Sequence, residues 1–359
     1  MQGVCPLGRV VFSVALLAFC VPSAAVGEGV TGEARSTRVA VDPESDTALV
    51  ADLLQFDAVP GSPETFSWRL RPVHSSMTGA TIYELTFPSP RPSPYEVNNT
   101  VWCRFYPAAG VAEGGRAPLA IVLHHLGGSF AAEAILAEFL GRSGIHALEV
   151  EFPYYGPRRP KSGKVSKGLM QADFERGIDA TRQGVADIRR ALDWAISRED
   201  VDPERTGLVG VSLGGIIGSL ACGVDRRLRR NVLILAGGDM AGILCHPSGE
   251  TRKVRKILKE RKIDVHTLRR TLAPIEPLRF AHRIDPRGVL MLNGRRDEVV
   301  PPATTEALWR EIGGPAIVWY ETGHYTTAVF LLDLFARTRD HFLRGGDLTQ
   351  TRAGGLEKP

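Results

Sequence analysis

The sequence predicts an α/β protein whose mostly parallel, doubly wound sheet has antiparallel strands at its N-terminal side. Continuous apolar runs such as 119–123 are typical of strands that are buried on both faces of a sheet. These runs alternate with helical patterns, of which 171–197 is the longest. Because alternating strands and helices form parallel sheets with right-handed crossovers, the two observations together predict the fold class.

The antiparallel part is predicted from two segments rich in β-forming residues, 81–87 and 100–106. A polar, proline-rich connection joins them. The residues before them, 26–60, show no sustained periodicity. They predict an N-terminal extension that starts loosely and includes a short docked helix within 39–56.

The following elements are taken from hydrophobic periodicity and from the turn residues between them. In chain order they are strand 119–123, helix 131–140, strand 147–152, helix 171–197, a strand ending at 211 with a helix after it, strand 232–236, strand 288–293, strand 316–320 and helix 326–343. An insertion of about fifty residues separates two of these strands. Residues 61–345 are thus predicted to form one domain, followed by a flexible tail, 346–359.

The N-terminus has the pattern of a secretory signal peptide, 1–25. Arg9 precedes an apolar run, Val10–Val21, and small residues follow, with cleavage expected near Ala25 or Gly27. The run is too short to cross a bilayer, so no transmembrane segment is expected. A lipid anchor at Cys20 is disfavoured because bulky Phe19 precedes it. The sequence therefore predicts an exported protein, periplasmic or extracellular.

Composition is that of an ordinary globular protein, with 43% hydrophobic and 23% charged residues in 359. The net charge of +4 falls to +3 without the signal peptide and gives no reason to expect a nucleic-acid partner. Cys103, Cys222 and Cys245 remain, so at most one intrachain disulfide is possible. Pairing of Cys222 with Cys245 is conceivable, but three small buried side chains are the favoured interpretation. The oligomeric state stays open.

The stretch 206–218 carries the strongest chemical signal, because Gly210-Val211-Ser212-Leu213-Gly214 fits the pattern G-x-S-x-G. In that pattern a sharp turn between a strand and a helix exposes a nucleophilic serine. Side chains at Gly210 or Gly214 would collide across such a turn. A glycine-rich turn without catalytic meaning would give the same five residues by chance, so the pattern needs partners elsewhere.

Two suitable partners follow later strands. Asp297 comes after strand 288–293 and His324 after strand 316–320. Side chains at the carboxyl ends of parallel strands meet at one edge of a sheet, where a serine would find its base and the acid that orients the base. Asp239, after strand 232–236, is the rival acid. His341 is disfavoured because it falls within the last helix.

The order Ser212, Asp297, His324 resembles that of the α/β-hydrolase superfamily over roughly 119–343. The resemblance implies the α/β-hydrolase fold with a lid insertion at about 240–282. It also implies a Ser-His-Asp triad in which His324 takes the serine proton and Asp297 orients the imidazole. Esterases of the dienelactone-hydrolase or acetyl-xylan-esterase kind are the most similar in overall pattern.

The resemblance further implies an oxyanion hole made by the backbone N–H groups of Leu126 and Leu213. The turn His124-His125-Leu126-Gly127-Gly128 is similar to the family's H-G-x-G turn, but His125 stands where glycine is usual. A metal site at the two histidines is the alternative, which we disfavour because no acidic or cysteine ligand has suitable spacing nearby. No metal or cofactor is expected.

Two segments are candidates for substrate contacts. His125 and the loop residues Tyr154, Tyr155 and Arg158 form the first set, with an ordinary surface loop as the equal alternative for the loop. The second is the insertion, whose segment Thr251–Lys262 holds seven Lys or Arg. A solvated basic helix face is the favoured interpretation there, and attraction to an anionic substrate or membrane surface the alternative.

These observations predict an exported serine hydrolase that cleaves carboxylic esters through an acyl-enzyme. Its partner would be a small-molecule, carbohydrate or lipid ester. A peptidase or lipase on the same fold, or a non-catalytic binding protein, remain alternatives. Acyl length and alcohol moiety depend on pocket shape, which the sequence does not give.

Overall fold

The computed structural model describes residues 29–36, 53, 65–75, 78–127, 131–161 and 173–344. The predicted signal peptide, the predicted tail and most of the 39–56 segment lie outside these residues. Within them a single ten-stranded sheet runs through the molecule in the order β1-β2-β3-β4-β6-β5-β7-β8-β9-β10. The strands are β1 (Val30–Arg35), β2 (Thr65–His74), β3 (Thr81–Pro88), β4 (Thr100–Tyr106), β5 (Ala117–Leu123), β6 (His146–Val150), β7 (Val201–Val211), β8 (Asn231–Ile234), β9 (Val289–Gly294) and β10 (Ala316–Tyr320).

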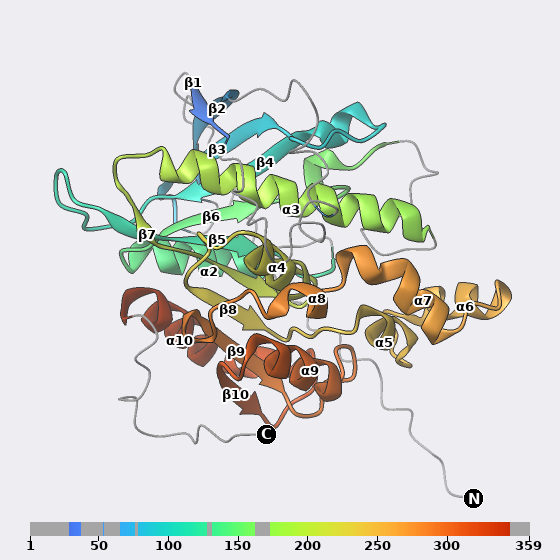
Figure 1. The fold of residues 1–359 in the computed structure, drawn as a ribbon. Coiled ribbons are helices and arrows are strands. Elements are labelled where there is room, and N and C mark those ends of the chain that lie inside the picture. Colours follow the sequence, from blue (N-terminus) through green and yellow to red (C-terminus); the bar gives the residue numbers. More distant parts are fainter. Residues whose placement is uncertain are drawn as a thin grey trace, which may run out of the picture.

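The predicted fold class is confirmed. From β6 to β10 neighbouring strands pair in parallel, and β1 to β4 pair antiparallel, with β4 joining β6 in the antiparallel sense. Helices cover both faces, as Figure 1 shows. They are α2 (Ala131–Arg142), α3 (Phe174–Ile196), α4 (Leu213–Val224), α5 (Met240–Cys245), α6 (Arg252–Glu260), α7 (Val265–Leu272), α8 (Leu278–Ala281), α9 (Pro302–Ile312) and α10 (Leu331–Arg344), with the short 3-10 helices η1 (Glu96–Asn99), η2 (Gly156–Arg158), η3 (Ala273–Ile275), η4 (Pro286–Gly288) and η5 (Thr326–Phe330).

The N-terminal side of the sheet is larger than predicted. Two antiparallel strands were expected, but β1 and β2 precede them. Residues 30–35 therefore form an edge strand, and the prediction of a loose start is wrong for them. In β2, Phe66, Trp68 and Leu70 face the core and alternate with exposed polar residues, a strand pattern that the prediction overlooked and that ends at Pro72, while β1 is paired on one side only.

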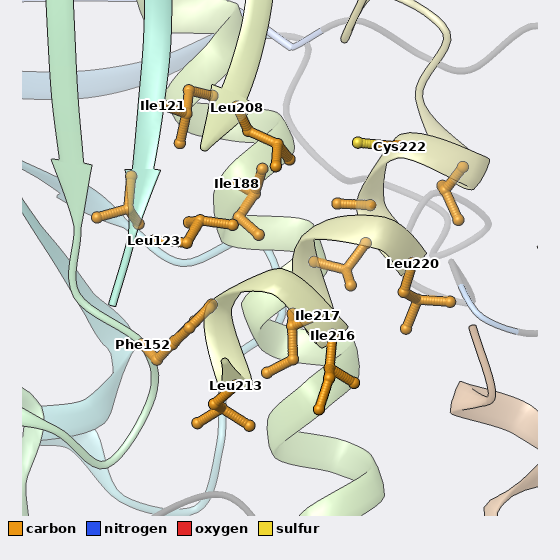
Figure 2. Close-up of a cluster of buried hydrophobic side chains, with 14 of the residues drawn as sticks. Ile121, Leu123, Phe152, Ile188, Leu208, Leu213, Ile216, Ile217, Leu220 and Cys222 are labelled. Atoms are coloured by element: carbon orange, nitrogen blue, oxygen red, sulfur yellow. The ribbon is translucent and has the colours of Figure 1, made fainter. Parts of the chain in front are cut away.

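The core consists of two layers, one on each face of the sheet. Because side chains alternate along a strand, Ile121 and Leu123 of β5 face the layer that contains α3 and α4, whereas Ala120 and Val122 face α2 and α10. Figure 2 shows the first layer, where Leu213, Ile216 and Ile217 of α4 lie in one cluster with Phe152 and Ile188. This packing fixes the start of α4, the helix that follows Ser212.

The three predicted mature cysteines are free thiols. Cys103 and Cys222 are buried as expected, and Cys245 is half-buried. None of the described helices combines the length and the apolarity that crossing a membrane would require.

Candidate active site

Ser212 lies in a strained turn between β7 and α4. Its backbone adopts φ 52° and ψ −112°, a combination that a residue with a side chain rarely occupies and that costs on the order of 1–3 kcal/mol. Its N–H donates to the carbonyl of Ile234, at 2.8 Å, so the neighbouring strand β8 holds the turn in place. The turn therefore presents the Ser212 side chain at the carboxyl edge of the sheet.

The flanking glycines are required by close backbone contacts. A Cβ at Gly210 would lie 2.3 Å from the carbonyl oxygen of Gly214, and one at Gly214 would lie 2.4 Å from that of Leu123. Both distances are far inside van der Waals contact with backbone, which cannot move aside. The steric reason given for the G-x-S-x-G pattern therefore holds at both positions.

The structure brings Ser212, His324 and Asp297 together. His324 Nε2 lies 2.9 Å from Ser212 Oγ, and His324 Nδ1 lies 2.7 Å from Asp297 Oδ2. All three side chains are buried, with residue exposures of 7%, 9% and 6% in that order. This is the geometry in which a carboxylate orients an imidazole that can accept the proton of a serine.

Asp297 is fixed by its own loop. Its Oδ1 accepts the backbone N–H groups of Val299 and Val300, at 2.8 and 2.7 Å, which leaves Oδ2 facing His324. Glu298 accepts the backbone N–H of His324 at 3.0 Å. The loop after β9 thus fixes the side chain of Asp297 and the backbone of His324.

The rival residues have other contacts. Asp239 accepts the N–H of Gly242 at the start of α5 and forms an ion pair with Arg269, at 2.7 Å. His341 is buried within α10, with Nε2 3.1 Å from the carbonyl oxygen of Gly288. The geometry therefore favours Asp297 over Asp239, and His324 over His341.

Leu126 and Leu213, the predicted oxyanion donors, both border the space beside Ser212. Leu213 is the first residue of α4, so its N–H has no intrahelical acceptor. Leu126 follows β5 on the turn that begins at His124. Within the described part of the chain, neither N–H donates to a protein acceptor.

The backbone φ of His125 is not positive, so the position at which the resembling turn has glycine does not need glycine here. Its backbone N–H and its Nδ1 both lie close to Oε1 of Glu133, at 3.0 and 2.6 Å. Glu133, in the first turn of α2, has a fully buried side chain. The hydrogen bond to Glu133 raises the pKa of His125. Glu133 therefore fixes the turn that carries Leu126.

Two cavities meet at Ser212. The larger, of about 240 Å³, is bordered by His324, His125 and Leu126 and extends between α2 and α10. The smaller, of about 90 Å³, is bordered by Leu213 and by α5 and α6 of the insertion. The first part of the insertion, residues 240–254, thus contacts the site. Whether the insertion opens as a lid stays a prediction.

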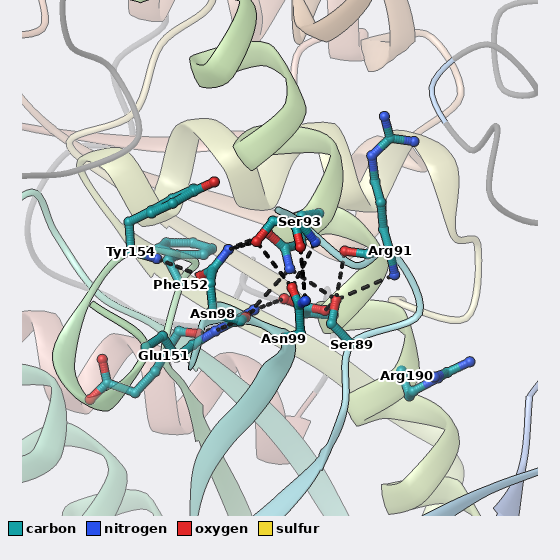
Figure 3. A network of polar contacts seen from close by, with 12 residues as sticks. Ser89, Arg91, Ser93, Asn98, Asn99, Glu151, Phe152, Tyr154 and Arg190 are labelled. Carbon is teal, nitrogen blue, oxygen red and sulfur yellow. Dashed lines mark hydrogen bonds and ion pairs between the residues drawn. The ribbon is translucent and has the colours of Figure 1, made fainter. Parts of the chain in front are cut away.

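The expectation that Tyr154, Tyr155 and Arg158 contact substrate is wrong. Arg158 is completely buried and pairs with Asp187 at 2.8 Å. It also donates to the carbonyl oxygens of Glu151 and Asn98. Asn98 accepts the N–H of Tyr154, in the network shown in Figure 3. Both tyrosines are core residues, and Tyr155 packs on the ring of His124. The loop is a structural support.

The basic segment of the insertion agrees with the favoured interpretation. Val254 and Leu258 of α6 are buried, while Arg252, Lys253, Lys256 and Lys259 are exposed. The described residues contain no group of three or more His, Cys, Asp or Glu side chains placed to hold a metal ion. The nearest polar partner of His125 is Glu133.

Two contacts at the site were missed from the sequence. Glu133 stands eight residues after His125 in the first turn of a predicted helix, so an acidic side chain near that turn was a usable signal. Tyr325 donates to Glu250 across the mouth of the larger cavity. These two residues are 75 positions apart, and no local pattern connects them.

Comparisons with known proteins agree with this fold. A family model described as acetyl xylan esterase (AXE1) matches residues 156–323, a little under half of the chain. Two curated Mycobacterium tuberculosis proteins, both described as uncharacterized, are 29% identical over 273 residues, or 75% of this chain. The chain spans 57% of the length of those relatives.

Two solved structures resemble the chain over most of its length. The acetyl xylan esterase from Paenibacillus sp. R4 is 18% identical, with a TM-score of 0.61 over 84% of this chain and 97% of its own. Acetyl xylan esterase 1 from Thermoanaerobacterium sp. JW/SL YS485 is 20% identical, with a TM-score of 0.57 over 81% and 94%. The chain therefore has the α/β-hydrolase fold of these two esterases.

Proposed function

We propose that this protein is a serine hydrolase that cleaves carboxylic esters through an acyl-enzyme. The observation that carries the proposal is the chain of contacts from Ser212 Oγ through His324 to Asp297, beside a cavity. The similarity of residues 156–323 to an acetyl xylan esterase family supports an ester as the substrate.

In the proposed reaction, Ser212 Oγ attacks the ester carbonyl carbon while Nε2 of His324 takes the serine proton. The bond to the alcohol oxygen then breaks as His324 returns that proton to the leaving oxygen, and the acyl group stays on Ser212. Water, deprotonated by His324, releases the acid. One ester and one water thus give one acid and one alcohol.

Asp297 would hold the imidazole in the tautomer that presents a free Nε2 to Ser212, and would stabilise the imidazolium that forms. The N–H groups of Leu126 and Leu213 would donate to the oxygen that becomes negative in each tetrahedral intermediate. Loss of one such donor typically lowers kcat by about 10²–10³-fold.

The proposal includes export. The pattern of residues 1–25 supports a cleaved signal peptide, and a size comparison of the secreted protein with the full chain, together with its N-terminal sequence, tests it. If the secreted protein still begins with residues 1–25, the proposed cleavage is wrong, but the proposed hydrolase activity is not affected.

A fluorophosphonate probe tests the central proposal, because it reacts covalently with activated serines. The wild type is expected to be labelled and Ser212→Ala to be silent. Ser219→Ala is the matched control, since this buried serine of α4 lies seven residues further on and its hydroxyl donates to Ile216. A folded wild-type protein that is not labelled and cleaves no ester would instead be a non-catalytic binding protein.

A further inference from the structure

The larger cavity at Ser212 is walled mainly by hydrocarbon. Its apolar lining comes from the ends of β7 and β8, from α2, and from the segment that includes η5 and the start of α10. The lining side chains of this kind are Leu126, Ala132, Leu136, Val211, Ile234, Leu235, Val299, Ala328, Leu331, Leu334 and Phe335. Such a surface binds an apolar group by removing it from water.

Most polar side chains of the same lining are already bonded to other protein groups; among the described residues, Oε2 of Glu133 is the lining side-chain atom that is buried without a hydrogen-bond partner. His125 is bonded to Glu133, Ser212 to His324, Tyr325 to Glu250, and Thr327 to the carbonyl oxygen of Gly323. A sugar ring carries several hydroxyl groups, each of which needs a partner when it leaves water. The cavity is therefore poorly suited to a carbohydrate and well suited to a hydrocarbon chain.

The size of the cavity indicates how much hydrocarbon it holds. An apolar cavity of about 150 Å³ in another protein binds benzene, which has six carbons. At about 240 Å³ the cavity beside Ser212 is larger. By that comparison it accommodates a group of roughly six to ten carbons. The second cavity at the same serine, of about 90 Å³, suits a much smaller group.

We propose that the substrate is a lipophilic ester, in which a hydrocarbon group of about six to ten carbons occupies the larger cavity and a small group occupies the other. The inference rests on the proposed function, since it concerns the ester that Ser212 would cleave. The hydrocarbon is on either the acyl or the alcohol side of the ester bond, and both arrangements use the same apolar binding.

Exposed apolar side chains that neighbour lining residues along the chain agree with this substrate class. Val329, Phe330 and Leu332 belong to the segment that forms one wall, and their exposed fractions are 74%, 40% and 83%. Tyr325, at the mouth, is 60% exposed. Exposed apolar side chains next to an apolar cavity lower the cost for a hydrocarbon chain to leave water as it enters.

Two substrate series test the proposal with the full-length mature protein. One series varies the acyl chain of p-nitrophenyl esters from acetyl to palmitoyl, and the other varies the alkyl group of acetate esters from methyl to decyl. In one series kcat/KM is expected to rise at least tenfold between two and eight carbons, since even one well-placed methylene contributes about tenfold in a hydrophobic pocket. The series that rises assigns the cavity to the acyl or the alcohol side.

Variants of one helix connect the profile to the cavity. Leu334→Phe fills the wall and should move the preferred chain length down by two or more carbons. Leu331→Phe, at a half-buried wall position, is the second variant in case the buried change impairs folding. Leu343→Phe is the matched control: it adds the same volume at an exposed position near the end of the same helix, outside the lining, and should leave the profile unchanged.

The failures of the two proposals are distinguishable. If the fluorophosphonate probe labels Ser212 but activity is highest on acetyl and methyl groups in both series, the lipophilic substrate is excluded and the serine hydrolase stands. If no ester is cleaved and Ser212 is not labelled, the proposed function fails. Calorimetry then measures the binding of octanoate, octanol, acetate and ethanol. Tighter binding of the eight-carbon compounds supports an apolar binding cavity, and equal weak binding of all four overturns the inference.

Discussion

At the scale of single residues, Asp297 and Asp239 differ in what surrounds them rather than in distance from a strand end. Oδ1 of Asp297 accepts two backbone N–H groups, and its Oδ2 faces His324. Both carboxylate oxygens of Asp239 accept hydrogen bonds from Arg269, and its Oδ1 also accepts a backbone N–H at the start of α5. Asp297 therefore orients the imidazole, whereas Asp239 stabilises the insertion.

Asp297→Asn is therefore expected to lower kcat by roughly 10³–10⁴-fold, because an amide can donate to Nδ1 and stabilise the wrong tautomer of His324. Steady-state kinetics on any accepted ester measures the effect. Asp239→Asn is the matched variant and should keep kcat within about threefold. It should lose at most about 1 kcal/mol of stability, from the exposed ion pair with Arg269, because asparagine caps a helix about as well as aspartate. Equal activity of Asp297→Asn and wild type would contradict the assignment.

Glu133 is a positioning residue, because it contacts His125 and not the reacting atoms. In Glu133→Gln the turn that carries Leu126 loses the charged acceptor that holds both its backbone and its imidazole. We expect kcat to fall about tenfold with little change in KM, since a misplaced oxyanion donor stabilises the transition state less but hardly affects substrate binding. Single-turnover kinetics separates the effect on the chemical step from the effect on binding.

Glu138→Gln is the control for that experiment. Glu138 lies on the same helix, is also buried, and accepts hydrogen bonds from Ser75 and Thr78 away from the cavity. It should lower stability without a selective effect on kcat. If both variants lose kcat equally, the contact between Glu133 and His125 has no special role.

At the scale of elements, the turn between β7 and α4 depends on the absence of side chains. Gly214→Ala places a methyl group 2.4 Å from the carbonyl oxygen of Leu123, so either the turn or β5 must move. We expect a loss of more than about 2 kcal/mol in stability and of most fluorophosphonate labelling. Gly249→Ala is the matched control, because its new methyl group meets no atom within 4 Å and should change neither.

The loop after β6 supplies a second prediction at this scale. Arg158 and Asp187 form an ion pair in which both side chains are buried, so Arg158→Met leaves an unpaired carboxylate in the core. The expected cost is about 3–5 kcal/mol, measured by chemical denaturation, with KM unchanged in the protein that remains folded. Asp187→Asn added to Arg158→Met should recover part of the loss. A raised KM at unchanged stability would restore the substrate-contact interpretation.

These elements also show how far the sequence predicts the molecule. The parallel strands and their helices were predictable because burial on both faces produces long apolar runs, and β10 agrees with its prediction at both ends. Asp297 and His324 could be placed beside Ser212 because strand ends in a parallel sheet meet at one edge. The edge strand β1 was not predictable, since it has no continuous apolar face. For β2, the alternation of Phe66, Trp68 and Leu70 with polar residues was a usable signal that was missed.

The role of Arg158 was missed for a different reason. An arginine in a loop of tyrosines and prolines has the same local pattern whether it faces solvent or the core. Its partner Asp187 lies on α3 and its other acceptor, Asn98, precedes β4, so only the tertiary structure identifies the pairing. The dimensions of the two cavities at Ser212 likewise depend on residues from elements distant in the chain.

At the scale of the whole molecule, stability should depend on pH through groups buried within the two-layered core. Burial raises the pKa of Glu149 on β6 to about 7, although Arg104 opposes it. Burial lowers the pKa of His124 and of His341 to about 4. The histidines stabilise the fold above their ordinary pKa and lose that contribution as pH falls towards 4. Glu149 acts in the opposite direction.

Glu149→Gln isolates the glutamate. Between pH 4.5 and about 7 the folded state binds a proton at Glu149 that the unfolded chain releases, so wild-type stability falls as pH rises through this window. The shift corresponds to a loss of at most about 3 kcal/mol above pH 7. The uncharged amide removes this loss, so the variant should equal wild type at pH 4 and exceed it increasingly up to pH 8.

Chemical denaturation at pH 4, 6 and 8 measures the difference between the two proteins. Exposed Glu113→Gln controls for the change in net charge and should show a flat difference. Because Arg104 and Tyr106 contact the Glu149 carboxyl group, a small constant offset from altered hydrogen bonds is compatible with the prediction. A stability difference that does not grow with pH would mean that Glu149 is charged in the folded protein at neutral pH.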